Sequence, residues 1–495
     1  MKHLNTGYRP MKKLFFFGVV FLCLSINLSG ETVSLEDFLD LVKTNHPLIV
    51  EENLTPEIET ERRFRYTTSR DWVLGGQASL YHSKPISTGS FTPSTLDIVG
   101  VSASLSRSLW STGGHLDLGW YTDYTEQTLP SLSFPGSGGS EAITTGFPRL
   151  YEHTLSLSFT KSILRNYGGQ LNRLDYDLAE YTVDISRLQA IENQEQFLLE
   201  IALTFVDWAL LEEQKKIMDQ RLQLAQDQLE LTTEKRRANL VDEVDVLRSE
   251  DAVRAARQNA FLLDSRSRAK QAELAVLAQT DSIRQLRPDY NLYQLVTYPS
   301  FSEAIVTLEH NSRALKILEA RHEQLQKLQG GFDESEKPNL DFNVGLAMKG
   351  GDNSLGNSLE LTKPDFFLSL MFTQPLGARA ARSNVYQTKL ELQQNQVRYQ
   401  RILLDLKSRL DALMIQLTDF EEILRLNQQE IESAQQKSEE ELRLYNQGRG
   451  ELTFVIQARD NMQNARLLYS ENAAGYHRLY LQYLALSDLL WDRDW

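Results

Sequence analysis

The feature of this sequence that most constrains its fold is the stretch from Gln170 to Arg236, which contains neither glycine nor proline. As one helix, a run of this length would span about 100 Å. No compact domain is that wide, so the helix must pack along a partner of similar length. An apolar residue recurs every three or four positions and leaves the other faces to Gln, Glu, Lys and Asp. These apolar positions are Leu188, Ile191, Leu198, Ile201, Phe205, Trp208, Met218, Leu222, Ala225 and Leu229.

A partner for this helix is present in the same chain. Residues 378–446 are again free of glycine and proline. Apolar residues stand among polar neighbours at Leu390, Leu392, Val397, Leu403, Leu404, Leu410, Leu413, Leu417, Ile423 and Leu424. The two runs predict a mostly α-helical protein that is organised around two long helices in coiled-coil packing.

The first 30 residues are typical of a secretory signal peptide. They carry Lys2, Arg9, Lys12 and Lys13, no acidic residue, and an apolar core over 14–24 that is too short to span a bilayer. We therefore expect the mature protein to be exported. No later segment has the roughly 18 consecutive apolar residues of a transmembrane helix, so contact with a membrane would use strands or surface attachment.

Charge and cysteine content exclude several classes of partner and site. Without the four basic residues of the signal, 48 basic side chains remain against 67 acidic ones, a net charge of −19. Nucleic acid and anionic lipid surfaces are therefore poor partners. The single cysteine, Cys23, lies in the signal, so the mature chain can form neither a disulfide framework nor a Cys metal site. Leu22 precedes it where lipid attachment needs a small residue, so lipidation is not expected.

Between Trp72 and Gly169 the spacing of apolar residues changes from helical to alternating, which predicts β-strands. Apolar residues alternate with polar ones over 99–109, 115–120 and 155–163, and a Thr-Gly-Gly turn at 112–114 separates the first two segments. An apolar row opposite a polar row suits a barrel wall with lipid on one side and water on the other. The alternative is a soluble sandwich with one buried face. The export signal and the long helices favour the membrane wall.

Three pairs of segments indicate that the chain contains two copies of one layout. Residues 34–48 correspond to 300–314, residues 155–164 to 368–377, and residues 236–250 to 445–459. Each copy reads as helix, strands, long helix, turn and return helix. The first copy has about four candidate strands and the second has two. An extra hairpin at roughly Ile98–Thr125 and the loop PGSGGSE at 135–141 account for the excess.

Together these features resemble the TolC-like family of outer-membrane efflux proteins, the outer membrane factors. The resemblance rests on the export signal, the opening SLEDFLDLVKTNHPL, the passages FTKSILRNYGG and FTQPLGARAA from strand into helix, and the duplicated layout. It covers nearly the whole mature chain. It implies a homotrimer whose strands close one shared β-barrel in the outer membrane of a Gram-negative-type bacterium. The helices would continue as an α-barrel across the periplasm, to a tip that docks an adaptor protein and an inner-membrane transporter.

The strand count bears on how such a barrel closes. A few strands per chain cannot enclose an aqueous channel, and open strand edges are not tolerated in lipid, so several chains must share the barrel. Four strands per chain would give twelve in a trimer, and eighteen if the extra hairpin joined the wall. Because the second copy has no counterpart of this hairpin, we expect it to project from the mouth or to cap it.

The function implied by the resemblance is a passive exit duct of a tripartite efflux or type I secretion system, without reaction or cofactor. The sequence contains no motif for such a reaction or cofactor. The seven later histidines are scattered without metal-ligand spacing, and GSGGS at 136–140 lacks the lysine of a phosphate loop. We therefore expect no catalytic and no metal site. Drug, metal and protein substrates all remain open. The alternative is a periplasmic coiled-coil scaffold or surface adhesin with a soluble β domain.

The resemblance places the functional residues in the two turns between long and return helices, at the periplasmic entrance. They are Asp242, Glu243 and Asp245 in the first copy, and Gly448, Arg449 and Glu451 in the second. Acidic residues repeated around a narrow opening attract cations, and attraction between Arg449 and these acids would help to hold the resting tip. The alternative for Asp242 is a helix N-cap.

One departure from the family pattern weakens the expectation of cation-selective gating. Phe454 and Gln457 stand where the return helix of the second copy would carry aspartates.

These interpretations divide the chain into eight parts. They are a signal peptide (1–30), a first-copy N-terminal helix (31–71), a first-copy β segment with the extra hairpin and loop (72–165), a first-copy long and return helix (166–283), a linker and second-copy N-terminal helix (284–335), a second-copy β hairpin (336–377), a second-copy long and return helix (378–490) and a tail (491–495).

Overall fold

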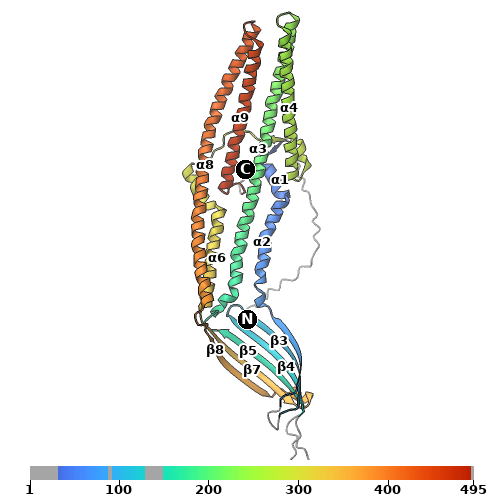
Figure 1. Cartoon of the computed structure of the whole chain (residues 1–495), viewed down its shortest axis with the longest axis vertical. Coiled ribbons are helices and arrows are strands. Elements are labelled where there is room, and N and C mark those ends of the chain that lie inside the picture. The colour runs from blue at the N-terminus through green and yellow to red at the C-terminus, as the bar shows by residue number, and fades with distance from the viewer. Residues whose placement is uncertain (1–31, 87–91, 129–148, 492–495) are drawn as a thin grey trace, which may run out of the picture.

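The computed structural model describes residues 32–86, 92–128 and 149–491. The expected signal peptide, the loop at 135–141 and residues 492–495 of the tail lie outside the described residues. The molecule is elongated, with a β-sheet at one end and long helices that run from it to the opposite end (Figure 1).

Two long helices set the length of the molecule. Helix α3 spans Gln170–Arg237 and helix α8 spans Arg379–Asn446, each with 68 residues. Each is followed by a return helix of 35 residues, α4 (Glu243–Leu277) after α3 and α9 (Leu452–Leu486) after α8. The matching lengths show that the chain is a structural duplication, as the paired segments of the sequence indicated.

Each copy opens with two shorter helices, where we expected one. They are α1 (Leu35–Asn45) and α2 (Pro47–Arg65) in the first copy, and α5 (Phe301–Asn311) and α6 (Arg313–Glu336) in the second. In the first copy Pro47 explains the break, because a proline disfavours helical backbone in the residue before it. In the second copy Ser312 makes the break, since its side chain caps α6 by accepting the backbone N–H of Leu315.

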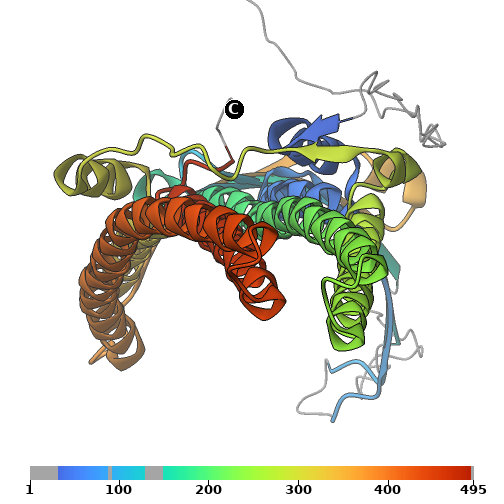
Figure 2. The same ribbon diagram turned by 90° about the horizontal axis from the view of Figure 1, so that it is seen from above.

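The helices stand side by side and form a curved wall. In the half next to the sheet the order is α2, α3, α6, α8, and in the distal half it is α4, α3, α9, α8. Seen from above, the wall is an arc (Figure 2). Its two edges are α8 on one side and α2 and α4 on the other. Beyond these edges the described residues place no helix of comparable length.

The main hydrophobic core lies at the middle of this wall, where α1, α5 and the segment 286–300 pack against α3 and α9. Phe205 and Trp208 of α3 are at its centre, 0% and 1% exposed, and the Phe205 ring lies 5.4 Å from that of Phe38. The short strands β1 (Thr32–Ser34) and β6 (Arg287–Asp289) pair in parallel beside the core. The apolar stripe predicted for the first long helix thus contains the residues that the structure buries most deeply.

A histidine fastens the segment that precedes α5 to α9. His477 is 4% exposed; its Nε2 donates to the carbonyl of Leu292 (3.0 Å), and the hydroxyl of Tyr290 donates to its Nδ1 (2.9 Å). Both ring nitrogens are thus used by the neutral imidazole. Burial lowers the pKa of His477 to about 4, because the charged ring would lose its hydration.

A buried ion cluster ties the C-terminal end of the chain to the wall. The guanidinium of Arg313, at the start of α6, contacts Glu192 (3.2 Å), Glu195 and Asp488 (2.9 Å). Glu195 also accepts the backbone N–H of Leu490 (2.7 Å). Burial raises the pKa of both Glu192 and Asp488. The three carboxylates share one guanidinium, so its removal would leave buried charge without a partner.

Six antiparallel strands form one open sheet at the other end of the molecule. Their spatial order is β2-β3-β4-β5-β7-β8. Their bounds are Val73–Ser83, Thr95–Leu109, Gly114–Thr128, Arg149–Ser162, Asn339–Asp352 and Lys363–Thr373, in that order. Strands β2 and β8 are the edges, and the two copies join where β5 pairs with β7.

The position of the extra hairpin contradicts our expectation. Strands β3 and β4 lie inside the sheet, because β3 pairs with β2 and β4 pairs with β5 along almost their whole lengths. The expectation of a projecting or capping hairpin is therefore wrong, and the sheet of this chain has six strands. The repeat does not predict the position of the hairpin, because a strand pair needs only hydrogen-bonding neighbours and not a counterpart in the other copy.

The turn of this hairpin packs against the start of α3, which explains the glycines of the passage RNYGG. Gly113 and Gly169 both have φ of +70°. A Cβ on Gly169 would lie 1.9 Å from the carbonyl oxygen of Trp110. Glycine is required here by both backbone conformation and space. The short helices η1 (Thr68–Arg70), η2 (Tyr167–Gly169), η3 (Asp281–Gln285) and α7 (Leu355–Ser358) complete the described elements.

Replacement of Phe205 and Trp208 together by aspartate should destabilise the wall by several kcal/mol, because two unpaired charges would enter the main core. Chemical denaturation followed by circular dichroism would measure the loss. The control is Gln196→Asp with Gln220→Asp, two exposed positions on the same helix. Equal stability of the two double variants would contradict the register assigned to α3.

The buried histidine predicts a pH dependence of stability. The folded pKa of His477, about 4, lies below its ordinary value of 6.5. The unfolded chain therefore takes up a proton first, and stability is lost as pH falls from about 6.5 towards 4. His477→Gln retains one donor and one acceptor and does not titrate. Thermal unfolding between pH 7.5 and 4.5 should show a steeper loss in the wild type than in this variant, and parallel curves would contradict the assignment.

Candidate functional site

The two turns at the distal end have the same local structure. After α3, Asn239 has φ of +53°, and the N–H of Leu240 donates to the carbonyl of Lys235 (2.9 Å). After α8, Gly448 has φ of +71°, and the N–H of Arg449 donates to the carbonyl of Leu444 (3.0 Å). Both are Schellman motifs, which end a helix with one left-handed residue. The first copy uses asparagine for this conformation and the second uses glycine.

A groove of about 790 Å³ lies between the two turns, and we call it the tip groove. It is lined by Asp242, Asp245, Gly448 and Glu451 of the predicted residues, whereas Glu243 and Arg449 are exposed outside its lining. The structure therefore brings acids of the first turn together with the second turn. Whether these residues line a pore in an assembly stays a prediction.

Basic residues that we did not predict balance the charge of the tip groove. Lys235, Arg236 and Arg248 also line it, three cations against Asp242, Asp245 and Glu451. Arg248 Nη1 contacts Asp245 at 3.1 Å, and Arg236 Nε contacts Glu243 at 3.2 Å. Two signals in the sequence point to these cations. Arg248 stands three residues after Asp245 on one helix face, and Lys235 and Arg236 stand in the last turn of a long helix, where cations are favoured.

Lys235 and Tyr445 join the ends of α3 and α8. The ammonium of Lys235 lies 3.6 Å from the centre of the Tyr445 ring, and it donates to the Tyr445 carbonyl (3.4 Å) and to Asn446 Oδ1 (3.3 Å). Tyr445 is 6% exposed and packs with Leu452 and Val455. Burial lowers the pKa of Lys235 and raises that of Tyr445. The contact holds the two hairpins in fixed relation at the tip.

The structure answers two further questions about the predicted residues. Asp242 occupies the N-cap position of α4, but its side chain makes no capping hydrogen bond. Arg449 forms no ion pair within the described residues, so an attraction between Arg449 and the acids of the first turn would have to act between copies of the chain. Phe454, which replaces an expected aspartate, is 51% exposed beside the tip groove.

The sheet has one apolar face and one polar face, in register across all six strands. One row of paired residues reads Leu74, Leu105, Leu118, Leu157, Leu346 and Phe366. The next row, on the opposite face, reads Gly75, Ser104, Gly119, Ser156, Ala347 and Asp365. The apolar row is open: Leu118 is 40% exposed and Phe366 is 70% exposed. Among the described residues no long helix covers either face, and the four-residue helix α7 lies against β7 and β5 (Figure 1).

The described residues contain one group of acids close enough together to bind a metal ion, namely Glu192, Glu195 and Asp488. The guanidinium of Arg313 already contacts all three carboxylates. The cluster is therefore explained as a structural ion pair. Within the same described residues, no helix combines the length and the apolar character that crossing a bilayer requires.

Comparison of sequences and of structures gives different results. No protein-family model and no curated protein sequence matches the chain. The outer membrane protein VceC of Vibrio cholerae has a similar structure, with a TM-score of 0.63 at 13% identity over 92% of this chain and 96% of VceC.

Two channels of other bacteria are similar to the same degree. The outer membrane channel CmeC of Campylobacter jejuni has a TM-score of 0.61 at 14% identity, over 92% of this chain and 85% of CmeC. The open-state outer membrane channel MtrE of Neisseria gonorrhoeae has a TM-score of 0.61 at 13% identity, over 92% and 89%. This protein therefore has the fold of the TolC-like outer membrane factors.

Proposed function

We propose that this protein is an outer-membrane exit duct, through which substrates pass from the periplasmic side without reaction or cofactor. The observation that carries the proposal is the sheet with one continuous apolar face, over which the described part of the chain places no second sheet and no long helix. Exposure of an apolar surface of this extent to water would cost free energy. In a barrel wall, the apolar face contacts lipid and the polar face lines a water-filled lumen, so each face has a suitable environment. The fold shared with VceC, CmeC and MtrE supports the same reading.

The duct is completed by further copies of the chain. Strands β2 and β8 expose unpaired backbone groups, which a bilayer does not tolerate. The curvature of the helical wall in Figure 2 also brings its free edges towards further copies around one axis. Three copies, the number that the sequence resemblance implies, would supply eighteen strands from six per chain.

The edges of the wall carry apolar stripes that suit such an assembly. On α2, Val50, Leu54 and Ile58 are four residues apart, and each is about half exposed. On α8, Leu390, Val397 and Leu404 are seven residues apart and exposed. Stripes at these spacings are the seams by which helices pack in coiled coils. In the assembly, α8 of one copy would pack against α2 and α4 of the next.

The tip is the surface for partners. Leu240, Val244 and Leu247 are 72%, 53% and 48% exposed around the first turn, beside the charged tip groove. Exposed apolar residues rimmed by charge are typical of protein interaction sites. We infer that this end docks an adaptor protein, which joins the duct to an inner-membrane transporter that supplies the energy. A tripartite efflux system and a type I secretion system both fit this arrangement.

The soluble scaffold or adhesin that the sequence left open is disfavoured by the same sheet. A soluble β domain would have to bury the apolar row from Leu74 to Phe366. The described residues place no second sheet or helix over it.

The assembly predicts that Leu54→Glu with Ile58→Glu abolishes the trimer, because two charges would enter the seam between copies. Native mass spectrometry of the detergent-solubilised protein should show a trimer for the wild type and a monomer for the variant. The control is Leu468→Glu on α9. This residue is similarly exposed (46%), but its helix already has α8 and α3 as neighbours. A folded wild-type monomer, or an unaffected trimer in the double variant, would contradict the proposal.

The tip predicts two separable effects on conduction. Arg449→Glu should raise single-channel conductance in planar bilayers, because it removes an attraction between copies that holds the tip. Asp242→Asn with Asp245→Asn should chiefly lower cation preference, because neutral side chains no longer focus the field. Each exposed pair is worth only about 0 to 1 kcal/mol, but symmetry repeats it.

The control for the first effect is Arg425→Glu, which breaks a surface pair with Glu422 on α8 far from the tip. It should leave conductance unchanged. Unchanged conductance for Arg449→Glu, together with weakened adaptor binding, would show that this turn docks the adaptor and does not act as a latch.

A further inference from the structure

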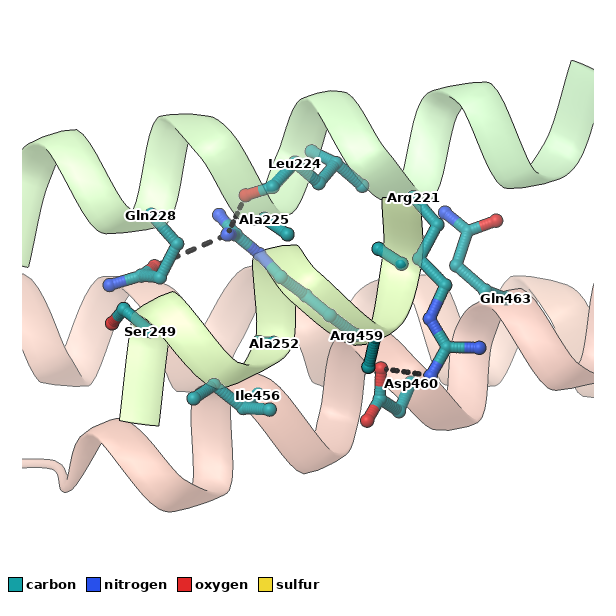
Figure 3. A pocket seen from close by; sticks show the side chains of 12 residues that line it. Arg221, Leu224, Ala225, Gln228, Ser249, Ala252, Ile456, Arg459, Asp460 and Gln463 are labelled. Atoms are coloured by element: carbon teal, nitrogen blue, oxygen red, sulfur yellow. Dashed lines mark hydrogen bonds and ion pairs between the residues drawn. The ribbon is translucent and has the colours of Figure 1, made fainter. Parts of the chain in front are cut away.

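A small cavity lies where α3, α4 and α9 meet, between the main core and the tip (Figure 3). Its volume is about 80 Å³, enough for more than one water-sized group. Ala225 of α3 and Ala252 and Ala256 of α4 create the space, because a larger side chain at any of them would fill it. All of its lining comes from one chain.

An unpartnered side chain points to an occupant of this cavity. Gln463 of α9 lines it and is 0% exposed, yet neither its Nε2 nor its Oε1 has a hydrogen-bond partner among the described residues. A buried amide without partners loses its hydration and gains no hydrogen bond in return, so native proteins rarely leave one unsatisfied. The cavity beside it is the space from which a partner can come.

The second observation is a guanidinium without an anion. Arg459 of α9 lies half-buried at the cavity, and its Nη1 donates to the carbonyl of Leu224 (3.0 Å) and to Gln228 Oε1 (3.2 Å), both neutral acceptors. Within the described residues it makes no ion pair. Burial lowers the pKa of Arg459, because the surroundings do not fully replace the hydration of its charge. The exposed Asp227 opposes this shift only through its charge, without a direct contact.

The other charges of the lining cancel. Arg221 Nη2 contacts Asp460 Oδ1 at 2.7 Å, so this pair contributes no net charge. Arg459 is then the single unbalanced charge of the cavity, which carries a net charge of +1. A net charge of +1 repels a cation. A divalent anion would reverse this charge, whereas a monovalent anion would neutralise it.

We propose that the cavity binds a small monovalent anion, of which chloride is the probe of choice, with the guanidinium of Arg459 as its charged partner. Figure 3 shows that the guanidinium of Arg459 reaches towards Leu224 and Gln228, whereas the amide of Gln463 lies beside Arg221 at the other end of the lining. Guanidinium and amide N–H groups are the donors that such an anion requires. The anion would compensate the charge on Arg459.

The site has a structural consequence for the wall. Arg459 reaches α3 from α9, and α4 closes the cavity, so a bound anion adds contacts between the two helical hairpins below the tip. Binding to the folded protein alone raises its stability by mass action. This inference does not depend on the proposed transport function, because the cavity lies within one protomer.

Chloride-35 NMR line width provides a direct test with the full-length protein in detergent. The buffer contains sodium gluconate, whose anion is too large for the cavity, and chloride is titrated at constant ionic strength. We expect broadening by the wild type that Arg459→Gln loses. The control, Arg466→Gln, removes a cation about two turns further along α9 that donates to Gln220 outside the cavity, and it should retain the broadening. Equal broadening by both variants would overturn the proposal.

A second variant covers the case in which Arg459→Gln fails to fold. Ala252→Leu fills the space and leaves Arg459 in place, so it should abolish the broadening and also the rise of Tm with chloride that we expect for the wild type. Retained broadening in this variant would assign the effect to the protein surface. Absence of any broadening by the wild type would show that the cavity holds water only.

Discussion

A helix about 100 Å long can bury its apolar stripe only against other helices that run beside it, and the rest of this structure depends on that constraint. The two long helices, α3 and α8, reach from the sheet to the tip, and no single helix of the described residues lies between them along this whole length. Two shorter helices pack between α3 and α8, α6 in the half next to the sheet and α9 in the distal half. The result is a wall and not a globule, with its largest buried side chains at the middle, where additional segments cover it.

The sheet also has an apolar face that extends along the whole element. Its strands keep one register from β2 to β8, so the alternation of each strand adds up to two complete faces of opposite character. A slip of one residue at any pairing would place leucines among serines. The glycines at Gly113 and Gly169 allow the hairpin turn to approach the start of α3 closely, which connects the sheet to the wall.

Between the core and the tip, the contact between the two hairpins becomes polar. Arg221 with Asp460 and Arg459 with Gln228 replace the leucines and aromatic residues of the core. At the end itself, Lys235 on Tyr445 joins the hairpins over a small apolar cluster. Polar contacts around a cavity are weaker constraints than close packing, so this part of the wall is the part best able to respond to a bound ion or partner.

The sequence by itself determined the elements and their duplication. Periodicity identified the long helices and the buried stripe of α3, alternation identified strands, and the matched turns located the tip, because each of these signals is local. Tertiary structure alone decided three matters. It inserted the extra hairpin into the sheet, since strand partners are chosen across the chain and the repeat carried no information on them. It balanced the acids of the tip with Lys235, Arg236 and Arg248, whose distance from those acids depends on how two turns pack. It also created the cavity at Gln463, because an empty space arises from the fit between three helices and is encoded in none of them separately.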